Sequence, residues 1–246
     1  MKSFGLTDKG KVRKDNQDSF IIEKCDAKDC LVVALCDGMG GAKAGGLASQ
    51  LSNKAFVSYI YAKLTSRVNR ALDFQKILRD ACTEANGVAY EYSQFDEEYN
   101  GMGTTIVGGV VKSNGNGYII NVGDSRAYAI DRTGIRQLTK DHSLVQMMVE
   151  RGELAPERAR TYPGKNFITR AVGTESVLES DLFHYRLSRG DCLLLCSDGL
   201  SNMMDDQEIL FEVVHGVNKQ LCCQRLLDIA KSRGAPDNVT SILVQV

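Results

Sequence analysis

The sequence predicts an α+β fold, an α-β-β-α sandwich in which two packed antiparallel sheets lie between outer layers of helix. Short apolar runs, which are typical of buried strands, follow one another along the chain without helices between them, and this favours antiparallel pairing. Helical periodicity occurs in two blocks, one after the early strands and one near the end. With 246 residues, no internal repeat and three prolines, the chain is expected to form one domain over residues 1–246.

The predicted strands are short apolar runs bounded by Gly, Asp or Asn. They lie within residues 2–37 and at about 104–112, 117–122, 125–131, 135–139, 182–187, 192–196 and 239–244. The polar residues 113–117 are expected to join two of these strands as a hairpin. The predicted helices lie at about 44–67, 71–94, 205–215 and 219–232.

Apolar residues at helical spacing mark the buried face expected for two of the helices. They are Leu51, Ala55, Tyr59 and Ala62 in the first predicted helix, and Cys222, Leu226, Ile229 and Ala230 in the last.

The segment 143–173 fits neither the strand pattern nor the helix pattern. It is charged and weakly helical, and it contains Pro156 and Pro163. Proline interrupts both helix interiors and central strands. We therefore expect an irregular excursion beside the functional site.

The composition excludes several classes of function. Net charge is −1 and no long basic run occurs, which gives no electrostatic basis for binding nucleic acid or an anionic membrane. No apolar segment approaches the ~20 residues that a membrane-spanning helix needs. The N-terminus lacks the apolar core of a signal peptide. We expect a cytoplasmic protein without nucleic-acid or membrane partners, and nothing in the sequence demands more than a monomer.

The eight cysteines fit buried thiols better than disulfides or zinc ligands. Several lie inside apolar runs, and none forms a Cys-x-x-Cys pair. A buried reduced cysteine behaves as a small hydrophobic residue. This interpretation agrees with a reducing, cytoplasmic location.

Four aspartates adjoin four separate apolar stretches, and this pattern is the main chemical signal in the chain. Asp37, Asp124 and Asp198 follow such stretches, and Asp237 precedes the closing one. Carboxylates at the ends of neighbouring strands have rigid supports and can converge. Clustered carboxylates repel one another unless a cation neutralises them, and Mg²⁺ or Mn²⁺ suits such oxygen ligands. Taken singly, each aspartate also fits an ordinary turn or loop cap; the repetition favours a metal.

Arg13 is a candidate phosphate ligand because its planar guanidinium can donate two hydrogen bonds to a phosphate. The alternative for this charged stretch is a solvated loop. Together with the aspartates, however, it suggests two metals bridged by Asp37, a pair ~3.5–4 Å apart that would activate a water for attack on phosphate. Neither a phosphate-binding loop followed by Lys-Ser/Thr nor a Cys-x5-Arg signature occurs.

Eight short motifs in order across nearly the whole chain resemble those of the metal-dependent protein phosphatases of type 2C (the PPM family), particularly their short bacterial members. The motifs are Arg13 with Asn16-Gln17-Asp18, Asp37-Gly38-Met39-Gly40-Gly41, Gly101-Met102-Gly103-Thr104-Thr105, Gly123-Asp124-Ser125-Arg126, Asp141-His142-Ser143-Leu144-Val145, Thr169-Arg170-Ala171-Val172-Gly173, Ser197-Asp198-Gly199-Leu200 and Asp237-Asn238-Val239-Thr240.

The resemblance implies two or three Mn²⁺ or Mg²⁺ ions and a role for each acidic position. Asp37 would bridge two ions and the Gly38 carbonyl would ligate one of them. Asp198 and Asp237 would complete the coordination of the other ion, while Asp18 would act through water. A third ion would be held by Asp124 and Asp198. Arg13 would bind the phosphate, and residues 143–173 would form a mobile flap beside the site.

The implied activity is hydrolysis of phosphoserine and phosphothreonine in proteins by a metal-bridging water, without a covalent enzyme intermediate. Phosphorylated proteins would be the substrates, and a serine/threonine kinase of the same cell would be the functional counterpart. The alternatives are a non-catalytic phosphoprotein-binding scaffold of the same fold, and a related phosphatase of anti-anti-sigma-type regulators. Retention of Asp37, Asp198 and Asp237 argues against the scaffold.

Two positions depart from the pattern of many animal relatives. Gln17 stands where they have glutamate, and Met39 stands where they have histidine. Both changes are common in bacterial members and do not predict inactivity. They leave open the proton donor to the leaving oxygen, for which a water on a third metal is the first candidate and His142 the second.

Overall fold

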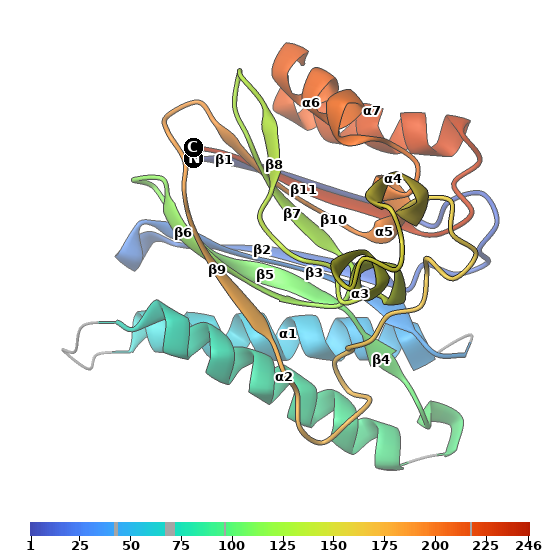
Figure 1. Cartoon of the computed structure of the whole chain (residues 1–246). Helices are drawn as coiled ribbons and strands as arrows, with labels where there is room; N and C mark the ends of the chain where they lie inside the picture. The colour runs from blue at the N-terminus through green and yellow to red at the C-terminus, as the bar shows by residue number, and fades with distance from the viewer. Residues whose placement is uncertain (42–43, 67–71, 96, 217) are drawn as a thin grey trace.

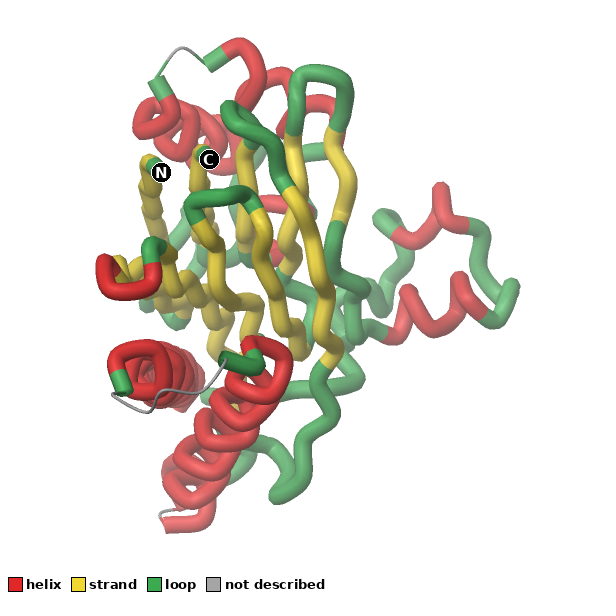
Figure 2. Tube along the Cα trace, turned by 90° about the vertical axis from the view of Figure 1, so that its left-hand side faces the viewer, coloured by secondary structure: helices red, strands yellow, loops and turns green. Residues whose placement is uncertain are grey.

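The computed structural model describes residues 1–41, 44–66, 72–95, 97–216 and 218–246. Two antiparallel sheets pack face to face between helical layers (Figures 1 and 2). One sheet has the order β1 (Lys2–Asp8), β11 (Val239–Gln245), β10 (Cys192–Cys196), β7 (Arg126–Ile130) and β8 (Ile135–Gln137). The other has the order β2 (Asp18–Cys25), β3 (Cys30–Met39), β5 (Ile106–Lys112), β6 (Asn116–Val122) and β9 (Asp181–Arg186), and β4 (Gly103–Thr104) pairs with the end of β3.

The helical layers confirm the predicted α-β-β-α sandwich. The outer face of the β3 sheet is covered by α1 (Ala44–Thr65) and α2 (Phe74–Phe95), and the outer face of the β10 sheet by α6 (Asp206–His215) and α7 (Lys219–Ser232) (Figure 1). Shorter helices are α3 (Leu144–Glu150), α4 (Pro156–Ala159), α5 (Asp198–Ser201) and the 3-10 turns Asp26–Lys28 and Glu97–Tyr99. The predicted helix limits at residues 67 and 71 lie outside the described residues.

The continuous apolar run of β3 is explained by burial on both of its faces. Val33 and Leu35 point into the core between the two sheets. Val32, Ala34 and Cys36 point the opposite way, into the core beneath α1 and α2. Alternate side chains of a strand face opposite sides of a sheet, so a strand covered on both sides is apolar at every position.

α1 forms as predicted, but its most buried row differs from the expected one. Phe56 and Ile60 are fully buried, whereas Ala62 is exposed. The predicted positions that are partly buried are Leu51, Ala55 and Tyr59. Tyr59 turns toward α2, where its hydroxyl lies 3.4 Å from Asp80 Oδ2. The helix therefore packs one row of residues on the sheet and a neighbouring row toward α2.

Two further differences concern the strand block and the segment 143–173. The strand expected over 104–112 is interrupted at Thr105, so that β4 and β5 are separate. The excursion contains α3 and α4, which project away from the sandwich (Figure 2). α3 begins at an N-cap, because the Ser143 hydroxyl accepts a hydrogen bond from Gln146 N.

All eight cysteines lie within the described residues, and each is a buried free thiol. Burial raises the pKa of Cys82 and Cys196 to about 12, so these thiols stay protonated and unreactive at neutral pH. In the part of the chain that the structure describes, no helix has both the length and the apolarity to cross a membrane.

Candidate metal and phosphate site

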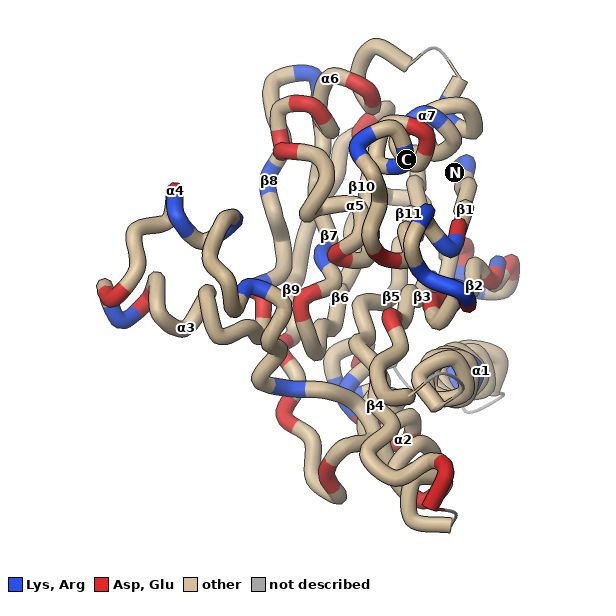
Figure 3. Tube along the Cα trace, turned by 90° about the vertical axis from the view of Figure 1, so that its right-hand side faces the viewer, with Lys and Arg blue, Asp and Glu red and all other residues tan. Residues whose placement is uncertain are grey.

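The predicted acidic residues lie at one edge of the sandwich because the strands that carry them end there. β10 ends at Cys196, two residues before Asp198, and β11 begins two residues after Asp237. β7 begins two residues after Asp124 and pairs with β10, so the three aspartates share one end of that sheet. Figure 3 views the molecule from this side and shows acidic segments gathered near the ends of β3, β10 and β11.

The second sheet brings its own carboxylates to the same edge. In the antiparallel pair of β2 and β3, Asp18 lies directly opposite Asp37. Gly38 follows in a crowded position, where a Cβ atom would lie 2.0 Å from the Gly45 carbonyl oxygen. Only glycine fits this close backbone approach.

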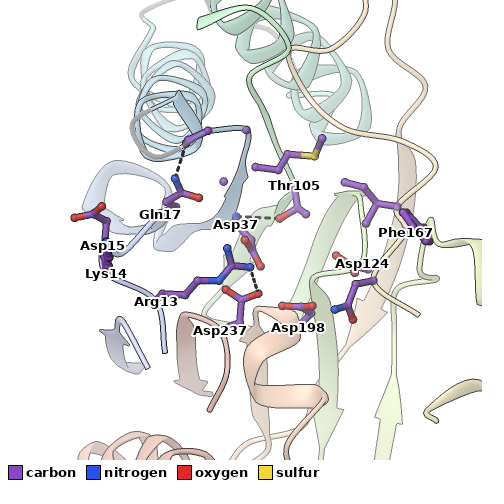
Figure 4. Close-up of a pocket in the computed structure, with 16 residues that line it drawn as sticks. Arg13, Lys14, Asp15, Gln17, Asp37, Thr105, Asp124, Phe167, Asp198 and Asp237 are labelled. Atoms are coloured by element: carbon purple, nitrogen blue, oxygen red, sulfur yellow. Dashed lines mark hydrogen bonds and ion pairs between the residues drawn. The ribbon is translucent and has the colours of Figure 1, made fainter. Parts of the chain in front are cut away.

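A pocket of about 710 Å³ collects these residues. Its lining includes Arg13, Asp37, Gly38, Asp124, Asp198 and Asp237. Figure 4 shows the Asp37, Asp198 and Asp237 side chains near one another, with the Arg13 guanidinium between Asp37 and Asp237. Arg13 Nη2 donates to Asp237 Oδ2 at 2.8 Å. The structure therefore brings six of the predicted site residues into one cavity.

Asp18 lies behind this pocket rather than in its wall. Its carboxylate is buried, and Oδ2 accepts hydrogen bonds from Ser197 Oγ at 2.9 Å and Thr240 Oγ1 at 2.5 Å. Its other oxygen, Oδ1, is buried without a hydrogen-bond partner. This placement agrees with a ligand that acts at one remove from an ion.

Burial and mutual repulsion disfavour the charged form of these carboxylates. Burial raises the pKa of Asp18 to about 7 and that of Asp198 to about 6, and the charge of neighbouring aspartates adds to each shift. The pKa values of Asp37 and Asp124 are raised well above their ordinary value, again mainly by burial and then by nearby carboxylates. A bound divalent cation would reverse this balance by supplying the missing positive charge.

The donor set fits a hard divalent cation. Every candidate ligand is an oxygen, as Mg²⁺ and Mn²⁺ prefer. Asp18 Oδ1 and Asp198 Oδ1 are buried and lack partners, which is costly unless a ligand satisfies them. Among the described residues no group of three acidic, cysteine or histidine side chains is already arranged so that it could hold a metal ion. In this structure Asp237 is paired with Arg13, whose guanidinium balances part of the negative charge of the cluster.

Sequence reasoning missed the polar side chains that hold the aspartates in place. Thr105 Oγ1 accepts a hydrogen bond from Asp37 N at 3.0 Å and lies 2.7 Å from Ser125 Oγ, which joins β3 to the turn that carries Asp124. Ser197 and Thr240 instead donate their hydroxyls to the Asp18 carboxylate. Their signal in the sequence is weak, because hydroxyl residues near strand ends are common.

Two basic side chains near the site have structural partners of their own. Arg126 forms a bidentate ion pair with Asp141, with Nη2 2.7 Å from Oδ2. His142, considered as a proton donor, is buried outside the pocket. Its Nδ1 accepts a hydrogen bond from Gly123 N at 3.1 Å and its Nε2 lies 3.2 Å from Asp181 Oδ2. His142 therefore links Gly123 to Asp181, and a role as proton donor in the pocket does not fit this geometry.

The fold and the pocket define an enzyme that uses divalent cations to act on phosphate esters. Residues 10–226 match the family model described as Protein phosphatase 2C. The chain belongs to the protein phosphatase 2C family, and it is a metal-dependent protein serine/threonine phosphatase.

Several characterised proteins are similar over almost the whole chain. Serine/threonine phosphatase Stp from Listeria monocytogenes is 36% identical over 243 residues, which cover 97% of this chain and 93% of that protein. The crystal structure of Stp1 from Staphylococcus aureus has a TM-score of 0.91 at 36% identity, covering 99% of this chain and 94% of that one. The catalytic domain of PstP, solved in complex with two manganese ions, has a TM-score of 0.83 at 30% identity, covering 99% and 97%.

Proposed function

We propose that residues 1–246 form one phosphatase domain whose pocket binds two or three Mn²⁺ or Mg²⁺ ions and the phosphate of a phosphoserine or phosphothreonine. The observation that carries this proposal is a single pocket lined by Arg13, Asp37, Asp124, Asp198 and Asp237, with the buried Asp18 opposite Asp37. Asp18 Oδ1 and Asp198 Oδ1 are buried without hydrogen-bond partners. The manganese ions bound to PstP support the choice of metal.

The proposed roles follow from where each side chain lies. The metal ligands are Asp37, the Gly38 carbonyl, Asp124, Asp198 and Asp237, with Asp18 acting through water. When bound, the cations would neutralise this cluster and activate a water for attack on phosphorus. Asp18, buried behind Asp37, would orient that water shell by its charge.

Arg13 is proposed to bind the phosphate oxygens. Its side chain is 54% exposed at the mouth of the pocket, so a substrate can reach it. Charge-assisted hydrogen bonds of this kind would hold the phosphate in line with the attacking water and stabilise the charge that develops on its oxygens. Asp37 at the end of β3 and Asp198 just after β10 would act on the opposite side of the phosphate only through the cations that they would hold.

The proton for the leaving serine or threonine oxygen cannot come from a histidine or from Met39 in this pocket. Met39 lines the wall but has no proton to give, and none of the three histidines lines it. We propose that a water delivers this proton.

The cellular setting is proposed from composition and from the thiols. Eight buried free cysteines support a cytoplasmic location. The net charge of −1 supports neither nucleic acid nor an anionic membrane as a partner. We propose that the protein signals as a monomer, opposite a serine/threonine kinase of the same cell.

Hydrolysis of p-nitrophenyl phosphate and of a phosphothreonine peptide tests the proposal. We expect turnover with Mn²⁺ or Mg²⁺, abolition by EDTA and recovery when metal is restored. The scaffold alternative predicts binding of the phosphopeptide without turnover under any metal. Equal activity with and without EDTA would contradict the metal site itself.

A further inference from the structure

A buried amide ties together the loop that carries Arg13. Asn238 is 3% exposed, and its Oδ1 accepts a hydrogen bond from Gln17 N at 2.8 Å. Its Nδ2 donates to the carbonyls of Lys9 and Asp15, both at 3.0 Å. One side chain therefore satisfies three backbone groups at the two ends of the Lys9 to Gln17 loop, using both donors of the amide.

The loop has no regular secondary structure, and its other attachments lie mainly near its two ends, where Gly38 N donates to the Gln17 carbonyl at 3.2 Å and Gln17 Nε2 donates to the Gly41 carbonyl at 3.0 Å. Residues 9–17 contain neither helix nor strand, and residues 11–15 are exposed. Other attachments include Lys11 N to the Ala235 carbonyl at 3.0 Å and Asn16 Nδ2 to Thr7 Oγ1 at 2.9 Å. Gly10, at φ +75°, lies so close to the Asp237 carbonyl that a Cβ would be 2.1 Å from its oxygen. The loop is thus pressed against the segment that contains Asn238.

A loop held at both ends presents its side chain at a lower entropic cost than a free one. Arg13 lies midway between the tied ends, with its guanidinium directed into the pocket (Figure 4). The residue that shapes this loop therefore sets how well the guanidinium is placed before a phosphate arrives.

We propose that Asn238 is a positioning residue for phosphate binding, acting through Arg13. The inference rests on the proposed role of Arg13. Asn238 touches neither the phosphate nor the metals in this role. Its backbone N–H, which donates to Asp237 Oδ1 at 2.8 Å, remains when the side chain is replaced.

The test is the inhibition constant of inorganic phosphate against Mn²⁺-dependent hydrolysis of p-nitrophenyl phosphate. Asn238→Ala should raise this constant and KM by about tenfold, a substantial part of the effect of losing one charge-assisted hydrogen bond. The Mn²⁺ concentration for half-maximal activity should change less than about twofold, because the metal ligands and their strands are untouched.

Asn86→Ala is the matched control. Asn86 is also a buried amide, 2% exposed, that accepts from Gly173 N at 2.8 Å and donates to the Glu175 carbonyl at 2.9 Å. It ties α2 to a segment away from the Arg13 loop. Asn86→Ala should lower the melting temperature about as much as Asn238→Ala does, while leaving the phosphate inhibition constant unchanged. An equal rise in both variants would overturn the inference.

A double-mutant cycle with Arg13→Ala separates the inference from the function on which it rests. In the Arg13→Ala background, Asn238→Ala should change the phosphate inhibition constant less than about twofold. Additive effects of the two substitutions would contradict the positioning role of Asn238 and would leave the assignment of Arg13 intact. If Arg13→Ala by itself leaves phosphate inhibition unchanged, the assignment of Arg13 fails first.

A measurement on the unaltered protein covers the case in which Asn238→Ala folds poorly. The Gln17 amide lies in a half-buried part of a loop outside helix and strand, yet its N–H should exchange slowly with deuterium because it donates to Asn238 Oδ1. Asn238→Ser, a milder change, should speed this exchange and weaken phosphate inhibition together. A fast-exchanging Gln17 amide in the unaltered protein would overturn the inference.

Discussion

Asp18 and Asp37 face each other directly across the antiparallel pair of β2 and β3. Like charges at opposed positions of two strands destabilise the pair. Asp18 is buried and Asp37 is partly buried, and the pKa values of both carboxyls are raised, first by burial. The register of β2 on β3 thus places two carboxyls where they repel each other when both are charged, and a cation bound there would reduce that repulsion.

Metal should therefore stabilise the folded protein. A ligand at 100 times its dissociation constant adds about 2.7 kcal/mol to the free energy of unfolding when it binds the folded state alone. We expect Mn²⁺ to raise the melting temperature by several degrees in differential scanning calorimetry, and EDTA to reverse the rise. Asp37→Asn should shrink the shift. A melting temperature indifferent to Mn²⁺ would contradict a folded-state metal site.

The stability of the metal-free protein should fall as pH rises through the range in which Asp18 titrates. Its pKa is about 7 in the folded state against an ordinary 3.8, so the folded state binds more protons than the unfolded chain between these values. Stability due to this group is present below the ordinary pKa and lost as pH approaches the folded-state value. Asp198, with a pKa of about 6, contributes in the same direction.

The measurement is urea unfolding in EDTA at several pH values, for the parent and for Asp18→Asn. The variant cannot ionise at position 18, so the free energy of unfolding of the parent, relative to the variant, should decrease between pH 5 and 7.5. A difference that is constant with pH would show that Asp18 is not buried in its neutral form.

Asp198→Ala should abolish turnover while the protein still folds. Asp198 Oδ1 has no hydrogen-bond partner, and Oδ2 accepts from Asn202 at 3.0 Å, so few packing or polar contacts are lost. Losing an electrostatic group of the active site costs about 10²–10³-fold or more in kcat. Activity assays with excess Mn²⁺ test this, and circular dichroism in EDTA checks folding. Replacement of the exposed Asp131 serves as control; near-normal turnover of Asp198→Ala would refute its assignment.

Arg13→Ala should lower kcat/KM by about 10–100-fold, the scale of a lost charge-assisted hydrogen bond to phosphate. Because Arg13 is bonded to Asp237, its removal also frees that carboxylate. The Mn²⁺ concentration for half-maximal activity should therefore stay the same or fall. Steady-state kinetics at several Mn²⁺ concentrations separate the two effects. Parent-like kcat/KM would mean that Arg13 does not bind the substrate.

Much of the sandwich could be predicted because local pattern and tertiary environment agree. The unbroken apolar runs of β3 and β10 predicted buried strands, and α7 (Lys219–Ser232) matches the predicted limits. The Asp-Gly pairs at strand ends indicated the pocket. These signals come from residues that are close together in the sequence, so they can be recognised in one sequence alone.

The contacts that complete the site depend on pairings remote in sequence. Arg13 meets Asp237, and Thr240 meets Asp18, across more than 200 residues. Asn238 looked like an ordinary turn residue, since nothing local shows that its amide meets the Arg13 loop. The row of α1 that faces the sheet likewise depends on where α2 packs. Such details follow from assembly of the layers rather than from periodicity.

The most direct test of the account is an anomalous difference map from crystals soaked in Mn²⁺. The account predicts at least two peaks in the pocket, one shared by Asp37 and both within coordination distance of carboxylate oxygens from Asp37, Asp198 or Asp237, with Arg13 released from Asp237. A pocket without peaks at saturating Mn²⁺, or peaks confined to other acidic surfaces, would contradict it.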